Sequence, residues 1–358
     1  MNASSNRRQW LRVSLGAAGA LALPQRGVFA GIAAPSPSLL QWRERALLGF
    51  GTTLSLRAAH AQGAVAEAGL SDAVAAIRHV ERQMSLFDPH SALSRLNRDG
   101  ELNDPHPDLV AILRLARSVS ARSGGSFDVT VQPLWAAWRR ASEAGRRPSA
   151  AELRDARSLV GWRGVKATAS QVRLARRGMA VTLNGIAQGY AADLAKAALS
   201  ARGIEHALLD TGEWQALGGG PGAEPWTLGI ENPLAADAPN PRPPARPPAS
   251  RPAPLNLQLL ARLVADGRAI ATSSDAHCSF SADRLHHHIL DPHTGKSPRE
   301  LASVTVLAPS GALADALTKV FFMAGWQPAL ALARQWGVDV LVLAKDGRWR
   351  ASAGTPLA

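Results

Sequence analysis

Thr182–Asp193 read TLNGIAQGYAAD, and this stretch predicts a strand that passes directly into a helix. We expect the strand to end at Asn184-Gly185 and a helix of small residues to follow, ending near residue 201. Free backbone N–H groups at such a helix start favour anionic groups, and Gly185 and Gly189 allow another group to approach closely. An ordinary strand-to-helix turn packed against a neighbour would give the same pattern. The spacing alone leaves both interpretations open.

Segments on both sides of this stretch alternate between helical and strand patterns, which predicts an α+β fold with a sheet covered by segregated helices. Helices are expected over 65–84, 107–123, 186–201, 312–324 and 328–336. Strands are expected over 46–56 (broken by two glycines), 163–167, 171–174, 179–183, 206–210, 226–230, 269–271, 288–290, 303–307 and 338–343. Residues 233–254 hold nine prolines, so we expect an extended surface insertion there.

The net charge of +12 suggests a nucleic-acid binder, but its distribution argues against one. Residues 1–30 contribute four positive charges and residues 139–177 a net of eight, so the rest of the chain sums to zero. Trp162 is the one aromatic residue in 139–177, which leaves no platform for stacking bases. We therefore expect a solvated face there and no nucleic-acid partner.

The overall composition excludes two further classes of protein. The hydrophobic content of 46% excludes a disordered polyelectrolyte. Cys278 is the single cysteine, which excludes an intrachain disulfide.

The N-terminal residues resemble an export signal. Asn6–Arg12 (NRRQWLR) precede an apolar run over 13–23, a pattern typical of the twin-arginine pathway. The run is about half as long as a membrane-spanning helix requires. Val28–Ala30 offer a cleavage site, and no cysteine follows the run, so a lipoprotein is not expected. We expect a signal peptide over 1–30, a periplasmic location and a mature domain over 46–358.

Two turn motifs carry candidate chemistry. Residues 124–131 (GGSFDVTV) would bring Phe127 and Asp128 to the rim of a cleft, although a core phenylalanine and a turn acid would look the same. Residues 286–295 (HHHILDPHTG) contain four histidines. Because adjacent strand residues point to opposite faces, one histidine placed for proton transfer is favoured over a zinc cluster.

A helical motif offers a third candidate. Asp315, Thr318 and Lys319 lie at positions i, i+3 and i+4 of an expected helix and therefore share one face. Two hard oxygen donors would suit Mg²⁺. The alternative is an Asp–Lys pair on the helix surface, of little energetic consequence. The residues alone favour that surface pair.

Taken in chain order, these motifs resemble those of the ApbE family of FAD:protein FMN transferases, from about Phe50 to the C-terminus. The matching motifs are FGT (50–52), SLFD (85–88), LSRLN (93–97), GSFD (125–128), NGIAQGY (184–190), GE (212–213), ATSS (271–274), HILDPHTG (288–295) and ADAL (314–317). The resemblance implies a T-fold-like α+β architecture, a mixed or antiparallel sheet with helices packed on it, and a cleft that binds FAD and Mg²⁺. Such proteins split the FAD pyrophosphate and move FMN to a threonine hydroxyl of an acceptor redox protein, with release of AMP.

The resemblance also implies roles for individual residues. Gly185 would offer its carbonyl and Asp315 its carboxylate to Mg²⁺, with Asp315 and His288 as the catalytic residues and His288 doing the acid–base work. Phe87 would stack on the flavin. The residues implied at the FAD site are Phe50, Phe87, Ser126, Phe127, Asp128, Thr182, Gln188 and Thr272.

Three positions depart from the family pattern. Lys319 stands where a metal-binding threonine is common, so either Thr318 serves as the ligand or the Lys319 ammonium replaces part of the metal charge. Thr182 and Gln188 stand where an acid and a lysine are common. We expect an exported flavin transferase that meets the membrane only through its acceptor protein. The alternative is a non-catalytic FAD-binding carrier or accessory protein of a periplasmic electron-transfer system.

Overall fold

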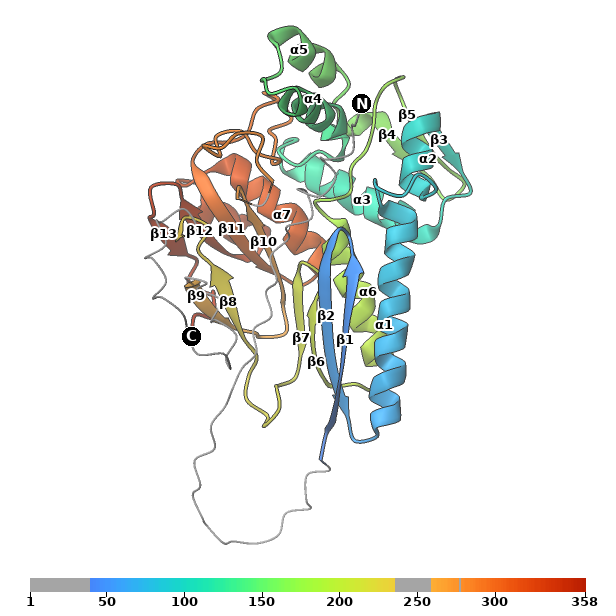
Figure 1. Cartoon of the computed structure of the whole chain (residues 1–358), viewed down its shortest axis with the longest axis vertical. Coiled ribbons are helices and arrows are strands. Elements are labelled where there is room, and N and C mark those ends of the chain that lie inside the picture. The colour runs from blue at the N-terminus through green and yellow to red at the C-terminus, as the bar shows by residue number, and fades with distance from the viewer. Residues whose placement is uncertain (1–38, 236–258, 277) are drawn as a thin grey trace, which may run out of the picture.

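The structure, a computed structural model, describes residues 39–235, 259–276 and 278–358. Within these ranges, eight antiparallel strands form a central sheet in the order β1-β2-β6-β7-β10-β11-β12-β13 (Figure 1). The strands are β1 (Gln41–Gly49), β2 (Thr52–His60), β6 (His206–Asp210), β7 (Trp214–Leu217), β10 (Ala269–Ser274), β11 (Leu301–Ala308), β12 (Asp339–Ala344) and β13 (Trp349–Ala351). The expected α+β class is confirmed.

The eight strands form one sheet, but neighbouring strands differ in how many residues they pair. Strands β10 and β11 pair along the whole of β10, whereas β7 and β10 share the single pair Ile270↔Trp214. The sheet therefore consists of two well-paired halves that meet at a narrow seam between β7 and β10.

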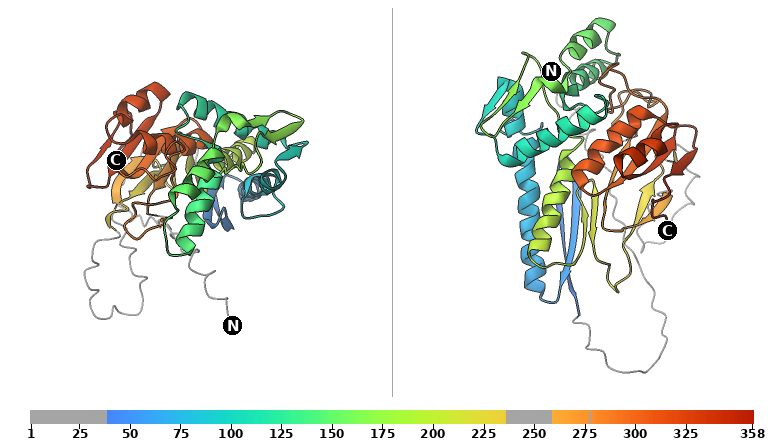
Figure 2. Two further views of the ribbon diagram at one scale, coloured as in Figure 1. Left: turned by 90° about the horizontal axis from the view of Figure 1, so that it is seen from above. Right: turned by 180° about the vertical axis from the view of Figure 1, so that it is seen from behind.

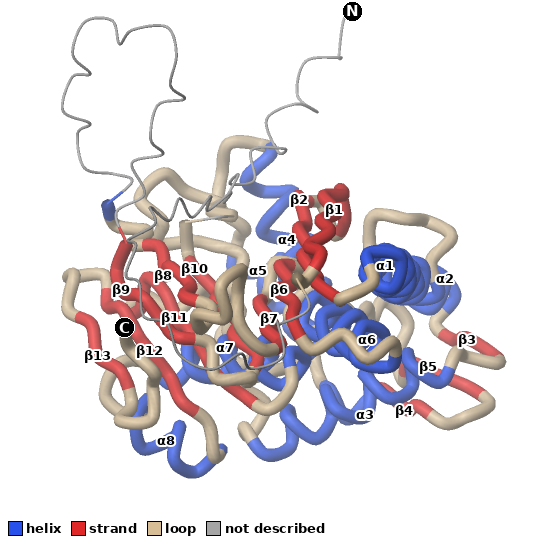
Figure 3. The backbone as a smooth tube through the Cα atoms, turned by 90° about the horizontal axis from the view of Figure 1, so that it is seen from below, coloured by secondary structure: helices blue, strands red, loops and turns tan. Residues whose placement is uncertain are grey.

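In the described part of the chain, helices cover one face of this sheet, as the view from behind shows (Figure 2) and the view from below shows again (Figure 3). They are α1 (Gly63–Met84), α6 (Ala187–Ala201), α7 (Gly311–Ala324) and α8 (Ala329–Trp336). Helix α1 buries Leu70, Ile77, Val80 and Met84, which recur at helical spacing and form its core-facing stripe. Helix α7 is buried on nearly every side because it packs against β10, β11 and α6.

Helices α6 and α7 cross in backbone contact. A Cβ atom on Gly189 would lie 2.0 Å from the carbonyl oxygen of Gly311, so neither position accommodates a side chain. One turn along α6, the Asp193 carboxylate accepts hydrogen bonds from Gly311 N (2.6 Å) and Ala312 N (3.0 Å) at the start of α7. These backbone donors have no partner within the helix, so Asp193 caps α7 and fixes its start against α6.

A helical region lies at one end of the sheet, at the top of Figure 1. Its helices are α2 (Ala92–Asp99), α3 (Pro107–Arg122), α4 (Gln132–Glu143) and α5 (Ala150–Ser158). The short strands β3 (Glu101–Asn103), β5 (Gln171–Leu174) and β4 (Val165–Ala167) form a small sheet in that order, and the 3₁₀ turns are η2 (Val129–Val131) and η3 (Trp162–Gly164). Strands β8 (Thr227–Glu231) and β9 (Leu259–Val264) form a separate pair.

All five predicted helices are confirmed, with bounds that differ by one or two residues. The prediction of a single strand over 46–56 was wrong, because Phe50 and Gly51 (φ of 51° and 80°) turn the chain into the β1–β2 hairpin. The strand predicted over 179–183 is also absent from the described structure. Side-chain bonds hold that segment instead, since Asn97 both donates to Val181 O (2.8 Å) and accepts from Val181 N (2.7 Å).

The strand expected over 288–290 is likewise not formed; His288 N donates instead to Cys278 O at 2.9 Å. Helices α2, α4 and α5 were missed, as were the short or edge strands β1, β3, β7, β9 and β13. A signal was available for α5, because Ser149 and Glu152 form a capping box at its start.

The segment 1–30 and nearly all of the proline-rich segment 233–254 lie outside the described residues. Over the residues that are described, we find no helix with the length and apolar character needed to cross a bilayer.

The α6–α7 contact gives a stability prediction. Gly189→Ala would force a methyl group into the Gly311 backbone, and we expect it to cost about 3 kcal/mol or more in the free energy of unfolding. Thermal denaturation followed by circular dichroism would measure this loss. Ser200→Ala, at an exposed position of the same helix, should change the melting temperature little. Equal melting temperatures for the two variants would contradict the close contact.

Candidate functional site

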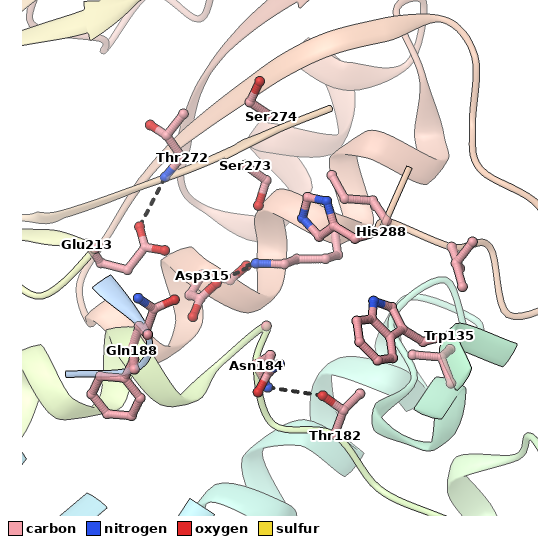
Figure 4. A pocket seen from close by; sticks show the side chains of 18 of the residues that line it. Trp135, Thr182, Asn184, Gln188, Glu213, Thr272, Ser273, Ser274, His288 and Asp315 are labelled. Carbon is pink, nitrogen blue, oxygen red and sulfur yellow. Dashed lines mark hydrogen bonds and ion pairs between the residues drawn. The ribbon is translucent and has the colours of Figure 1, made fainter. Parts of the chain in front are cut away.

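A pocket of about 600 Å³ lies above the β7–β10 seam. Its walls come from the β1–β2 turn, the start of α6, one face of α7, the segments 126–132 and 288–292, and α4. Figure 4 shows Asp315, Glu213 and Gln188 grouped on one side of the pocket and Trp135 on the other. Segments far apart in the chain therefore meet around one cavity of the size that holds small organic ligands.

Nearly every site residue expected from the sequence lines this pocket. Those that do are Phe50, Phe87, Ser126, Phe127, Asp128, Thr182, Gly185, Gln188, Thr272, His288 and Asp315. Thr318 does not: it is fully buried, and its hydroxyl lies 2.7 Å from Ser273 Oγ and donates to Asp315 O at 2.7 Å. The roles of the lining residues remain predictions.

Two phenylalanines lie at the rim. Phe87 is 69% exposed although it is large and apolar, and it follows the end of α1. Phe50 lies at the turn of the β1–β2 hairpin, where its backbone N–H donates to Glu81 Oε1 at 2.8 Å. An exposed aromatic ring at a pocket mouth can stack on the planar ring system of a ligand, which agrees with the expectation for Phe87.

Asp128 lines the pocket and holds its wall together through hydrogen bonds of both carboxylate oxygens. Its Oδ1 accepts from the N–H and the hydroxyl of Thr130 (2.8 and 2.6 Å), and its Oδ2 accepts from Trp162 N (2.8 Å). Burial raises the pKa of Asp128, and these hydrogen bonds oppose that rise. Trp162 belongs to the basic stretch 139–177, and Arg139 of the same stretch lines the pocket, so this stretch also contributes to the cleft.

Gln188 and Thr182 make local contacts at the start of α6. Gln188 Nε2 donates to Thr211 O (3.1 Å), and Thr211 Oγ1 donates back to Gln188 O (3.1 Å), which ties α6 to the turn between β6 and β7. Thr182 Oγ1 accepts from Asn184 N at 3.3 Å. Both residues therefore shape the floor of the pocket beside Gly185.

Glu213 and Asp210 were not assigned a role from the sequence, yet both line the pocket. Glu213 is 5% exposed, and its Oε2 accepts from Thr272 N at 3.1 Å, a side-chain bond across the β7–β10 seam. Burial, together with the neighbouring Asp315 charge, raises the pKa of Glu213 well above its usual range. In the sequence, the one indication that this region belongs to the site was the Gly212-Glu213 motif. A two-residue motif has no periodic pattern from which a role for Glu213 or Asp210 could be predicted.

The histidine-rich turn places one of its adjacent histidines in the pocket. His287 is buried, and desolvation lowers its pKa to about 4. His286 stacks on Trp138 with ring centroids 4.8 Å apart. His288 lines the pocket, and its Nδ1 lies 3.1 Å from Cys278 O. A carbonyl oxygen can only accept, so Nδ1 carries the hydrogen in the neutral ring and Nε2 is the nitrogen that can take a proton.

Lys319 and Asp315 form an ion pair at the inner end of the pocket. Lys319 Nζ bonds to Asp315 Oδ1 and also donates to Asp315 O at 3.1 Å. The Asp315 side chain is 1% exposed and that of Lys319 is 19% exposed, so the interpretation as a surface pair was wrong. Gly189 N, in the first turn of α6, lies 3.5 Å from Asp315 Oδ2 and donates to it.

The described residues do not fit a Mg²⁺ ion between Gly185 and Asp315. The Lys319 side chain lies between these groups, with its Cε 3.0 Å from where a Cβ on Gly185 would lie. Thr318 directs its hydroxyl to Ser273 and to the helix backbone. Mg²⁺ requires a near-octahedral set of oxygen ligands, and Asp315, the one carboxylate among the predicted ligands, is already bonded to an ammonium group.

Comparisons with known proteins agree with this architecture. The sequence model of the ApbE family matches residues 50–342, and the chain belongs to this family. A protein of Treponema pallidum named FAD:protein FMN transferase is 30% identical over 69% of this chain and 68% of its own length. A protein of the same name from Rhodobacter capsulatus is 29% identical over 67% of this chain but only 43% of its own length.

A solved structure gives the same result for the fold. The crystal structure of the Pseudomonas stutzeri flavinyl transferase ApbE in its apo form superposes with a TM-score of 0.71. The match covers 88% of this chain and 95% of that chain, at 26% identity. The expected ApbE architecture is therefore confirmed.

Asp210 gives a prediction for the pH dependence of stability. Burial raises its pKa from 3.8 to about 6, so between these values the folded chain retains a proton that the unfolded chain has lost. Stability contributed by this group should therefore fall as the pH rises from about 4 to about 6. Asp210→Asn removes the titration and should gain about 1–3 kcal/mol above pH 6.

Urea unfolding of the wild type and of Asp210→Asn at several pH values would measure this difference. Asp99→Asn, at an exposed position of α2, is the matched control and should run parallel to the wild type. Parallel curves for Asp210→Asn and the wild type would contradict the raised pKa.

Proposed function

We propose that this protein is an FAD:protein FMN transferase. Family membership and the names of its relatives support the reaction class. The observation that carries the proposal is the convergence of separate sequence motifs on one cleft, which joins a rim aromatic (Phe87), a histidine (His288) and an ion pair at its inner end. The cleft volume of about 600 Å³ lies in the range of cofactor sites.

The proposed reaction transfers FMN from FAD to an acceptor. The oxygen of an acceptor threonine attacks the phosphorus on the FMN side of the pyrophosphate. The bond from that phosphorus to the bridging oxygen breaks, and AMP leaves with the bridging oxygen. The hydroxyl proton passes to a base, and the product is a phosphoester between FMN and threonine. No change of oxidation state occurs, so the reaction needs no oxidant or reductant.

The chain's own residues supply positioning and proton transfer in this proposal. Phe87 is placed to stack on the flavin at the pocket mouth, with Trp135 on the pocket wall. Backbone N–H groups at the start of α6 favour the phosphates, although Asp315 already occupies one of them. His288 Nε2 accepts the threonine proton, and the Cys278 carbonyl holds the ring in the tautomer that this step needs.

The decisive experiment is an assay with purified protein, FAD and the acceptor domain of a redox protein that carries covalent FMN on threonine. We expect AMP in the supernatant, measured by liquid chromatography, and a fluorescent acceptor band in a denaturing gel. FAD retained on the protein without AMP release would overturn the proposal and favour the carrier function.

His288 gives a sharper prediction. His288→Asn removes the proposed base, and we expect AMP release to slow by about 10²- to 10⁴-fold while FAD binding is retained. His293→Asn, an exposed histidine in the same turn, is the matched control and should keep wild-type activity. A rate for His288→Asn within a few fold of the wild type would contradict the assignment.

We further propose that the protein acts in the periplasm on a soluble or membrane-bound redox protein. Support comes from the sequence pattern over 6–30, which is typical of twin-arginine export. A fusion of residues 1–38 to a reporter should be exported, and replacing Arg7 and Arg8 with lysine should stop export. Export of the lysine variant would contradict the proposal.

A further inference from the structure

The inner end of the pocket holds a cation that belongs to the chain itself. The Lys319 ammonium group is bonded to both the side chain and the backbone carbonyl of Asp315. Because Asp315 is 1% exposed, its charge would be costly without a partner. Lys319 lies four residues along the same helix, where side chains reach each other without distortion. The negative charge of the buried Asp315 carboxylate is therefore balanced by a lysine side chain of the same helix.

Lys319 also fills the place that the family resemblance assigns to Mg²⁺. Its stem packs on Gly185, with Cε 3.0 Å and Nζ 3.6 Å from the position of a Cβ there. Its ammonium group meets Asp315, the expected carboxylate ligand. A divalent ion could reach these two residues only by displacing the lysine from both.

The described residues that line the pocket offer no second cation in the same position. Among the described residues that line it, the cationic side chains are Lys319 and Arg139. Arg139 belongs to α4 on another wall, where its Nε donates to Glu143 at 2.8 Å and its guanidinium group lies over Trp135. An ammonium group has three N–H donors, and Asp315 accepts two of them. The third can be donated to a phosphate oxygen.

We infer that the Lys319 ammonium group takes the place of the divalent ion in this pocket and presents the positive charge and donor that the FAD pyrophosphate requires. The identity of FAD as the ligand rests on the proposed function. Binding of FAD and transfer of FMN then proceed without Mg²⁺. The pair of Lys319 and Asp315 is neutral, whereas Mg²⁺ with one carboxylate would keep an excess positive charge, so the attraction for the pyrophosphate is weaker here.

Direct metal binding tests the inference without relying on turnover. Mn²⁺ substitutes for Mg²⁺ at oxygen sites, and its free form is measured by electron paramagnetic resonance. We expect the wild type to leave the free Mn²⁺ signal unchanged, both alone and with FAD, after subtraction of an FAD-only control. One equivalent of bound Mn²⁺ that Asp315→Ala abolishes would overturn the inference.

Replacing Lys319 tests the same inference in the opposite direction, by creating a metal site where the wild type has none. Lys319→Thr restores an oxygen donor at this position and uncovers Asp315, so we expect it to bind one equivalent of Mn²⁺. The double variant Lys319→Thr/Asp315→Ala should lose that binding. Mg²⁺ should raise the melting temperature of Lys319→Thr but not that of the wild type, because a ligand stabilises the state that binds it. A folded Lys319→Thr that binds no Mn²⁺ would also overturn the inference.

Two controls distinguish metal binding at Asp315 and Lys319 from effects elsewhere in the protein. Lys196→Thr removes a lysine of α6 whose Nζ donates to Gly267 O outside the pocket, and it should behave as the wild type. His79, His106 and Asp108 form a cluster elsewhere that could take a metal. Binding at that cluster would persist in Asp315→Ala and would leave the assignment of Lys319 standing. If Lys319→Thr does not fold, the comparison of the wild type with Asp315→Ala still decides.

The metal dependence of AMP release provides an independent test of the inference. AMP release by the wild type should be unchanged in EDTA, whereas release by Lys319→Thr should require added Mg²⁺. Loss of wild-type activity in EDTA, restored by Mg²⁺, would overturn the inference. If no AMP appears under any condition, the proposed function fails, and the Mn²⁺ measurements still decide whether Lys319 replaces the metal.

Discussion

The contact between α6 and α7 is the constraint on which the site depends. Gly189 and Gly311 let the two backbones touch, and Asp193 caps α7 at the same point. This crossing sets the distance between the turn just before α6, which contains Gly185, and the face of α7 that carries Asp315 and Lys319. The side chains that the two helices bring to the pocket keep a defined geometry only if the helices do not slide past each other.

Burial of α7 determines the electrostatics of the pocket. On an exposed helix, an Asp–Lys pair at i and i+4 contributes little, because water screens both charges. Here the sheet, α6 and the neighbouring elements enclose Asp315, so the ammonium group of Lys319 becomes its main source of compensation. The same enclosure raises the pKa values of Glu213 and Asp210. Groups of α7 therefore act on the Asp315 and Glu213 carboxylates, whereas burial alone raises the pKa of Asp210.

The sequence predicted the parts of this protein that depend on local pattern. The five predicted helices, the α+β class and most lining residues follow from periodicity and from motifs such as NGIAQGY. The hairpin at Phe50 was missed because a non-glycine residue adopts a positive φ there. The burial of Lys319 and the seam contact of Glu213 could not be predicted, because both arise where segments distant in sequence meet. Thr318 shares a helix face with Asp315 in sequence, but packing against β10 turns its hydroxyl to Ser273.

The seam between β7 and β10 has a mechanical consequence. A sheet resists bending through its rows of backbone hydrogen bonds, and here the row narrows to one pair, Ile270↔Trp214, supplemented by the Glu213 side chain. The two halves of the sheet are therefore joined at their strands by few hydrogen bonds, while the α6–α7 contact joins them on the helical side, and the cleft lies over this junction. Glu213 and Trp214 on one side of this junction and Thr272 on the other all line the cleft, so a ligand that fills it would add contacts where the backbone pairing between the strands is sparsest.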